Sequence, residues 1–202
     1  MQAKISKEEL ESLPKVDFSG TIKVINDFEQ AKIAVQEIKD AHTLIGFDTE
    51  TRPSFTKGVV YKVSLIQLSV GNTAYLFRLN KMKGMSPELK DLLCDSNYIK
   101  VGLSTPDDFH NLRKWDDSLK QKGVIEIQDH VKKYGIEDMS LAKIYGILFG
   151  LKISKRQRLT NWEADELTHK QQQYAALDAV ACVDIYNELL TMGRTIIKKG
   201  GY

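Results

Sequence analysis

Apolar and polar residues follow two different periods along this chain, and the period separates expected strands from expected helices. Short apolar or alternating runs are typical of strands, and such runs occur at 21–25, 44–50, 63–70, 73–79, 99–103 and 124–128. Apolar residues three or four positions apart predict helices, at 6–13, 27–39 and 86–93, and another that begins at 105, before the last strand. Beyond residue 128 the helical spacing continues, and we expect helix to the end of the chain.

The order of these elements predicts the fold class. Gly71-Asn72 is a turn signal, so the runs at 63–70 and 73–79 should form an antiparallel hairpin. Helical segments separate most of the other strands, as in sheets with parallel neighbours. We therefore expect an α/β protein with a mixed sheet of about five strands, a meander at one sheet edge, and flanking helices.

Length and composition fit one globular domain, because 42% of the 202 residues are hydrophobic and 28% are charged. Residues 1–20 are mostly polar and contain Pro14 and Gly20, so we interpret them as an N-terminal arm. The domain should then cover 21–192, with a C-terminal tail at 193–202. The net charge of +2 neither requires nor excludes a nucleic-acid partner.

The chain carries no signal that directs it to a membrane or out of the cell. Its first residues lack the apolar core of a signal peptide, and no stretch approaches the roughly 20 apolar residues of a membrane span. Cys94 and Cys182 lie far apart in helical apolar contexts, which is typical of buried free thiols in a reducing compartment. We expect a soluble, cytoplasmic protein.

The first candidate site lies at the end of the run 44–50, where Asp48 and Glu50 are two residues apart. Alternate side chains of a strand point to the same face, so both carboxylates should lie on one face. Their repulsion favours a divalent cation between them. The alternative is that both acids simply mark the polar exit of a strand, because this short motif is weak on its own.

A third candidate acid heads the helix that begins at Thr105-Pro106. Asp107 and Asp108 both occupy its first turn, where acids commonly cap a helix or favour its dipole. Helical spacing places Asp107 on a polar face, whereas Asp108 starts an apolar stripe with Leu112 and Trp115. Asp108 should therefore point inward, although a one-residue ambiguity between the two aspartates stays open.

The last helix buries a fourth candidate acid. Asp178 lies on a stripe of apolar residues, and Tyr174 precedes it by one helical turn. A buried carboxylate without a partner is costly, so Asp178 needs an arginine or a metal ion. A structural ion pair explains Asp178 alone, but less readily all four acids together.

These motifs, in this order, resemble the three motifs of the DEDD 3′–5′ exonucleases in their tyrosine subclass. The segment 161–186 is similar to the last motif of the ribonuclease D and Werner-type exonuclease domains, and the resemblance covers about 22–191. Asp165-Glu166 departs from the family pattern, which commonly has an Arg-Pro pair before the Leu-Thr step. Gln173 stands where the histidine subclass has its histidine, so that subclass is disfavoured.

The resemblance implies a ribonuclease H-like fold and hydrolysis of phosphodiester bonds from the 3′ end of DNA or, less favoured, RNA. It implies two divalent cations, Mg²⁺ or Mn²⁺, and no organic cofactor. Asp48 would bridge both ions, Glu50 and Asp178 would hold the nucleophile-side ion, and Asp108 would hold the other through water. Tyr174 would orient the attacking water. Two alternatives are a catalytically silent nucleic-acid-binding module and a carboxylate cluster without an ion.

Basic and aromatic residues near these motifs are candidates for substrate contact. Cationic side chains bind phosphates without selecting sequence, and the candidates are Arg52, Lys57, Lys152, Lys155, Arg156 and Arg158. Phe55 or Trp162 would stack on a base. The alternatives are a solvated surface for the basic residues and a packing role for Trp162. No motif reports on the 2′-hydroxyl that distinguishes RNA from DNA.

Overall fold

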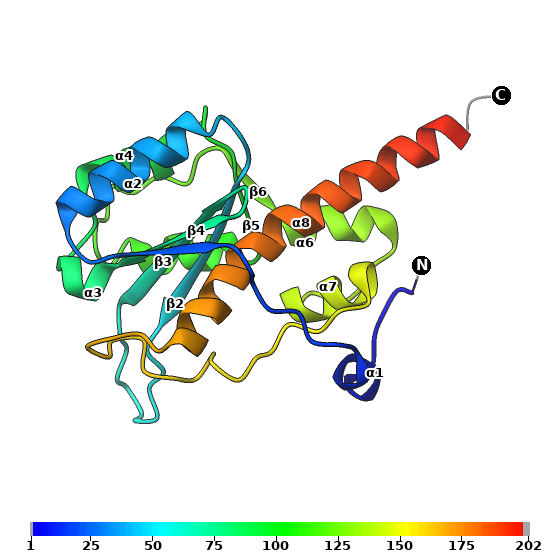
Figure 1. The fold of residues 1–202 in the computed structure, drawn as a ribbon, viewed down its shortest axis with the longest axis horizontal. Helices are drawn as coiled ribbons and strands as arrows, with labels where there is room; N and C mark the ends of the chain where they lie inside the picture. The colour runs from blue at the N-terminus through cyan, green and yellow to red at the C-terminus, as the bar shows by residue number, and fades with distance from the viewer. Residues whose placement is uncertain (1, 200–202) are drawn as a thin grey trace.

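A six-stranded mixed sheet forms the centre of the computed structural model, which describes residues 2–199 (Figure 1). Its strands are β1 (Thr21–Ile25), β2 (Ile45–Thr51), β3 (Val63–Val70), β4 (Thr73–Arg78), β5 (Lys100–Gly102) and β6 (Val124–Glu126). The strand order is β1-β4-β3-β2-β5-β6. β3 is antiparallel to β2 and β4, whereas the pairs β1–β4, β2–β5 and β5–β6 are parallel.

The mixed sheet predicted from the sequence is confirmed, with six strands where about five were expected, but the meander is placed differently. The strands β2-β3-β4 of the meander lie in the middle of the sheet rather than at an edge. β1 adds to the outer side of β4 in parallel orientation. Such a pairing between distant strands leaves no local sequence signal, because each run has the same period whichever neighbour it pairs with.

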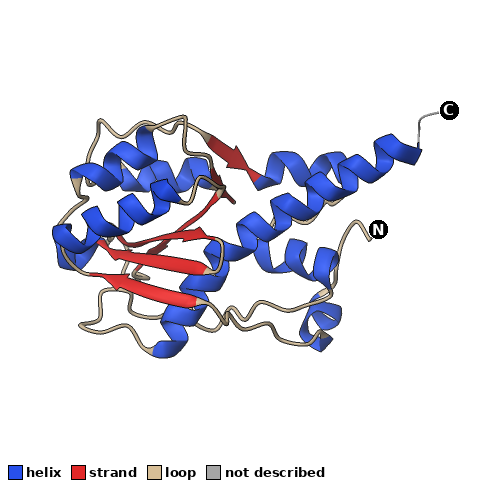
Figure 2. Ribbon diagram, turned by 45° about the horizontal axis from the view of Figure 1, so that its top comes forward, coloured by secondary structure: helices blue, strands red, loops and turns tan. Residues whose placement is uncertain are grey.

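We call the face of the sheet beneath α2 (Phe28–Asp40) and α4 (Pro87–Cys94) the core face. Figure 2 shows these helices packed against one side of the strands. Asp27 caps α2, and the apolar stripe of this helix is buried as its period predicts. The short α3 (Leu79–Met82) and α5 (Thr105–Leu112) complete this layer with buried residues.

We call the opposite face, crossed by α8 (His169–Lys199), the site face. The helix begins with a capping box, because the Thr168 hydroxyl accepts from the Gln171 backbone N–H and the Gln171 amide oxygen accepts from the Thr168 N–H. The same helix also packs on α6 (Ile127–Val131) and α7 (Leu141–Phe149). Among the described helices, none has a stretch long and apolar enough for a bilayer.

The prediction of continuous helix after residue 128 was wrong. A 3₁₀ turn at Lys132–Tyr134 follows α6, and α7 ends at Gly150, which adopts a left-handed conformation. Residues 151–168 contain no helix. Long-range contacts hold this segment instead: the Arg78 guanidinium donates to the carbonyl oxygens of Ala164 and Asp165.

The N-terminal arm packs on this segment and on α7. Its helix α1 (Lys7–Ser12) has a capping box formed by Ser6 and Glu9. Lys152 donates its backbone N–H to the Pro14 carbonyl at 2.8 Å and accepts from the Val16 N–H at 3.1 Å. Gly146 on α7 leaves room for Leu10, because a Cβ there would lie 2.8 Å from the leucine methyl. The arm is therefore an integral part of the packed structure.

Candidate active site

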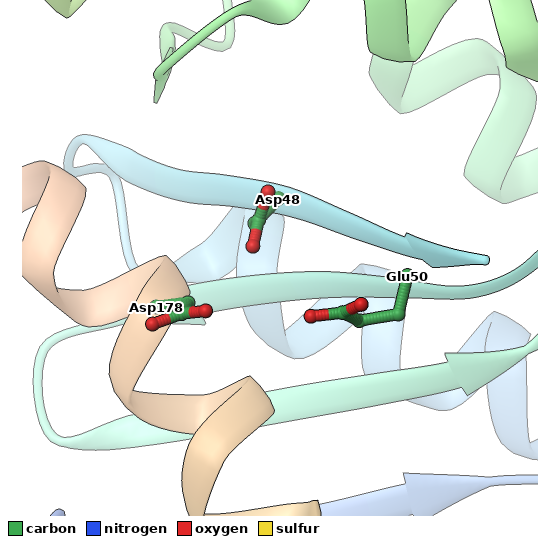
Figure 3. Close-up of side chains that lie close together, drawn as sticks. All are labelled: Asp48, Glu50 and Asp178. Atoms are coloured by element: carbon green, nitrogen blue, oxygen red, sulfur yellow. The ribbon is translucent and has the colours of Figure 1, made fainter. Parts of the chain in front are cut away.

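Three carboxylates from β2 and α8 converge on the site face (Figure 3). One oxygen from each of Asp48, Glu50 and Asp178 lies within 4.8 Å of the others. Strand alternation places both β2 acids on this face, as the sequence predicted. Gly46 brings α8 close, because a Cβ at this position would lie only 2.0 Å from the Ala179 carbonyl oxygen. A glycine beside the acids thus sets the distance between strand and helix.

Burial and mutual repulsion raise the pKa values of these acids when no cation lies among them. Desolvation, followed by repulsion from the neighbouring acids, raises the pKa of Glu50 to about 10. Desolvation also raises the pKa of Asp178 to about 7, and it raises that of Asp48 well above its ordinary value. Within the described part of the chain, no ion pair joins any of these carboxylates to a basic side chain. A cluster of oxygen ligands of this kind fits a hard divalent cation.

Asp108 lies on α5, near the three converging acids, but its carboxylate is hydrogen-bonded to a different residue. The Thr49 hydroxyl, which lies on the core face of β2, donates to its carboxylate. Burial and then repulsion from Asp48 raise the pKa of Asp108 to about 8. Asp107 is exposed, as the helical spacing predicted. Asp108 is therefore near the three converging acids without sharing their compact cluster.

Tyr174 precedes Asp178 by one turn of α8, and its hydroxyl donates to that carboxylate. Desolvation and the nearby carboxylates raise the pKa of the phenol far above its ordinary value. The ring packs beside Trp162, with ring centroids 6.1 Å apart. Tyr174 is thus a neutral hydrogen-bond donor held at the edge of the carboxylates.

A cavity of about 270 Å³ opens beside these residues. Tyr174 and Asp178 form one side, and Lys155 and Arg158 from the irregular segment line it as well. Arg158 lies near enough to Glu50 to lower the pKa of its carboxyl, and Lys155 acts likewise on Asp178. The structure therefore brings two of the six predicted basic residues to the acids.

The other four predicted basic residues lie farther out. Arg52 bonds Glu163 at 3.2 Å and stacks over the Tyr61 ring, and Lys152 bonds Glu11 at 3.0 Å. Lys57 is exposed in the loop between β2 and β3, whereas Arg156 is exposed in the segment 151–168. For these residues the structure leaves the predicted phosphate contacts as expectations.

The two aromatic candidates have opposite environments. Phe55 is 85% exposed in the loop after β2, where a base can reach it. Trp162 is fully buried with Leu65 and Leu76 beneath α8, so it cannot stack on a substrate base. The packing interpretation of Trp162 is therefore the one that the structure supports.

Sequence reasoning missed two polar residues that shape this site. Gln67 pairs with Asp48 across the β2–β3 ladder and is fully buried, and neither amide atom has a hydrogen-bond partner among the described residues. Glu126 accepts from the backbone N–H groups of Ser104 and Thr105 at 3.0 and 2.8 Å, and so fixes the start of α5. The available signal for Gln67 was a lone amide within the apolar run of β3.

Comparison with known proteins gives a consistent set of relatives. The family model described as 3′–5′ exonuclease matches residues 22–194. The bifunctional 3′–5′ exonuclease/ATP-dependent helicase WRN of Mus musculus is 30% identical, over 96% of this chain and 14% of the mouse protein. A 3′–5′ exonuclease of Arabidopsis thaliana is 31% identical, over 92% of this chain and 69% of the plant protein. This chain thus spans only a small part of the mouse relative.

Solved structures share the fold at lower identity. The Nibbler EXO domain of Aedes aegypti has a TM-score of 0.77 at 20% identity, and covers 91% of this chain and 93% of its own. Escherichia coli RNase D, an exoribonuclease, has a TM-score of 0.74 at 23% identity over 85% of this chain and 44% of its own. These similarities confirm the α/β, ribonuclease H-like fold predicted from the sequence.

Proposed function

Because this chain belongs to the 3′–5′ exonuclease family, we propose that it hydrolyses phosphodiester bonds from the 3′ end of nucleic acid and releases nucleoside monophosphates. The observation that carries the proposal is the convergence of Asp48, Glu50 and Asp178, none of which forms an ion pair with a basic side chain in the described part of the chain. Holding such acids together is unfavourable without a cation. Their arrangement is thus better suited to binding metal than to stabilising the fold.

Members of this family depend on divalent metal ions. We propose that Asp48, Glu50 and Asp178 hold two ions, Mg²⁺ or Mn²⁺, with Asp108 supporting the second from α5. Bound divalent ions lower the pKa of the attacking water and neutralise charge on the phosphate and the leaving oxygen. The Thr49 hydroxyl keeps the Asp108 carboxylate oriented toward the end of β2.

Tyr174 serves in this proposal as a positioning group for the attacking water. Its phenol is neutral because burial and the nearby acids raise its pKa, so it donates a hydrogen bond rather than accepting a proton. Its place on α8, one turn before Asp178, keeps the hydroxyl beside the carboxylates.

Lys155 and Arg158 are the phosphate contacts that the geometry supports best, because both line the cavity beside Asp178. Arg52, Lys57, Lys152 and Arg156 would make weaker contacts farther from the acids. We favour DNA over RNA as the substrate. We further propose a cytoplasmic location, supported by the two free thiols.

Purified protein tests the proposal when it is incubated with 3′-labelled single strands and Mg²⁺ or Mn²⁺. We expect mononucleotides from the wild type, and at least about a thousandfold slower release from Asp48→Asn, because several kcal/mol of metal-mediated stabilisation would be lost. Calorimetric titration of Mn²⁺ should show binding to the wild type and weaker binding to the variant. Strand binding without metal-stimulated release would support the silent module, and no heat of Mn²⁺ binding would support a cluster without an ion.

A further inference from the structure

A second and larger groove adjoins the carboxylate site. It has a volume of about 1210 Å³ and lies between the N-terminal arm, the segment 151–157 and the first turns of α8. Its size exceeds the roughly 300–1,000 Å³ of ordinary small-molecule pockets. The arm supplies one wall of the groove, so residues outside the conventional limits of the domain help to form it.

The groove is lined by an excess of positive charge. Lys7, Lys155, Arg156 and Lys170 are exposed, and no ion pair engages them within the described residues. The two acids of the lining are already paired: Glu11 bonds Lys152, and Asp17 bonds Lys15. The unpaired charges along this groove are therefore predominantly cationic and available to an anionic partner.

The groove is continuous with the proposed site of hydrolysis. Lys155 and Tyr174 line both the groove and the cavity beside Asp178. Lys170, Tyr174 and Asp178 are spaced four residues apart on α8, so they follow one side of the helix from the groove to the acids. A polymer whose end lies at Asp178 can therefore continue past Lys170 toward α1.

The lining also contains apolar surface. Leu13 and Val16 of the arm, together with Leu177 of α8, face the groove. A surface that combines cations for phosphates with apolar side chains for sugars and bases suits a single strand, whose bases are unpaired. Charge and composition thus point to the same class of partner.

We propose that this groove binds the single-stranded segment of the digested strand on the 5′ side of the scissile bond, with Lys7 and Lys170 contacting its phosphates. This inference rests on the proposed exonuclease function and deepens it, because it assigns a role to the arm. It makes the protein select for an unpaired strand several nucleotides long.

The test is a pair of charge reversals, Lys7→Glu together with Lys170→Glu. The matched control is Lys32→Glu with Lys120→Glu, which changes the net charge equally through exposed lysines on the core-face side of the molecule. Each variant digests a trinucleotide and a strand of about fifteen nucleotides that share the same 3′ end. Thermal melts establish that all variants are folded.

For the longer strand we expect the groove variant to raise KM about tenfold, and to reduce the slope of log KM against log salt by about 1.4, or roughly 0.7 per lost phosphate contact. For the trinucleotide, KM should rise less than about twofold, because this substrate is too short to reach α1. The control variant should resemble the wild type on both substrates. An equal rise in KM for both substrates, or no rise for either, would overturn the proposal.

Binding measured without catalysis separates the two proposals. In an Asp48→Asn background without metal, fluorescence anisotropy should show that Lys7→Glu with Lys170→Glu weakens single-strand binding. If the wild type releases no nucleotides but this weakening is observed, the proposed hydrolysis is wrong and the proposed strand-binding role of the groove is supported. If a fully paired blunt duplex binds as well as the single strand and is weakened equally, the groove is a duplex surface and the single-strand assignment is wrong.

Discussion

The two faces of β2 both pack against helices but differ in what they bury. On the core face, Phe47 is fully buried and packs on the Phe109 ring, with centroids 5.3 Å apart. The site face meets α8 and carries the alternating residues Gly46, Asp48 and Glu50. Burial stabilises the first face, whereas it raises the pKa values of the carboxylates on the second.

This difference shows how one strand can serve both stability and chemistry. Apolar burial favours folding at roughly 25 cal/mol per Å², so the core face can hold β2 in place. The site face uses that rigidity to keep like charges together, although their mutual repulsion opposes this arrangement. The core face thus supports a site that is unfavourable until a cation binds.

Widening the gap between β2 and α8 should have the largest effect on this contrast. In Gly46→Ala the new methyl would meet the Ala179 carbonyl and the Ser69 hydroxyl, at 2.0 and 2.3 Å. We expect a loss of about 1–3 kcal/mol in stability. A displacement of Asp178 by about 1 Å would lower the rate of nucleotide release about a hundredfold. Urea unfolding and single-turnover assays measure the two effects.

Gly146→Ala is the matched control for that change. Gly146 lies on α7, its new methyl would meet the flexible end of the Leu10 side chain on α1, and alanine favours the helix by about 1 kcal/mol. This control should retain the wild-type rate. If Gly46→Ala also retains it, the glycine does not set the geometry of the site.

The stability of the metal-free protein should fall as pH rises. The folded-state pKa values of Asp178, Asp108 and Glu50 are about 7, 8 and 10, whereas their ordinary values are 3.8, 3.8 and 4.5. Above about pH 4.5 the unfolded chain has released protons that the folded site still holds, so stability decreases as pH rises through the folded values. Melting in chelator should therefore lose several degrees between about pH 6 and pH 9.

Mg²⁺ should weaken or reverse that trend, because it binds the deprotonated carboxylates. The variant Asp178→Asn removes one titrating group, so it should show a shallower pH dependence in chelator. A metal-free melting temperature that rises over this range would contradict the assigned directions of the pKa shifts.

The smallest expected effect concerns the amide opposite Asp48. Replacing Gln67 by leucine removes a buried polar group without a partner, so the metal-free protein should gain about 1 kcal/mol of stability. If this amide orients Asp48, the variant should also bind Mn²⁺ several-fold more weakly, as calorimetry would measure. The neighbouring change Leu68→Gln buries an amide on the core face and should cost about 2–4 kcal/mol. A destabilised Gln67→Leu would show that the amide has a partner, such as a buried water.

Much of the fold was accessible from periodicity, but the irregular segment was not. β3 and α2 have strong local patterns, and their expected bounds differ from the observed ones by at most one residue. Residues 151–168 owe their shape to distant partners, such as Arg78 and the backbone of Val16. A local period cannot report such contacts, so this segment was misinterpreted as helix.

The candidate site shows the same limit. Alternation on β2 and the apolar stripe of α8 predicted which way Asp48 and Asp178 point, and the structure brings them together. The pairing of Thr49 with Asp108, and of Gln67 with Asp48, depends on how α5 and β3 are placed beside β2. The sequence does not specify that placement locally.

The backbone hydrogen bonds between Lys152 and the arm connect the first twenty residues to the segment that carries Lys155 and Arg158. A chain shortened to begin at residue 21 would keep every motif acid, yet this segment would lose its hydrogen bonds to the arm. It would then still cleave a terminal nucleotide but dissociate sooner from a long polymer. Processivity, rather than bond cleavage, is the property that the arm should control.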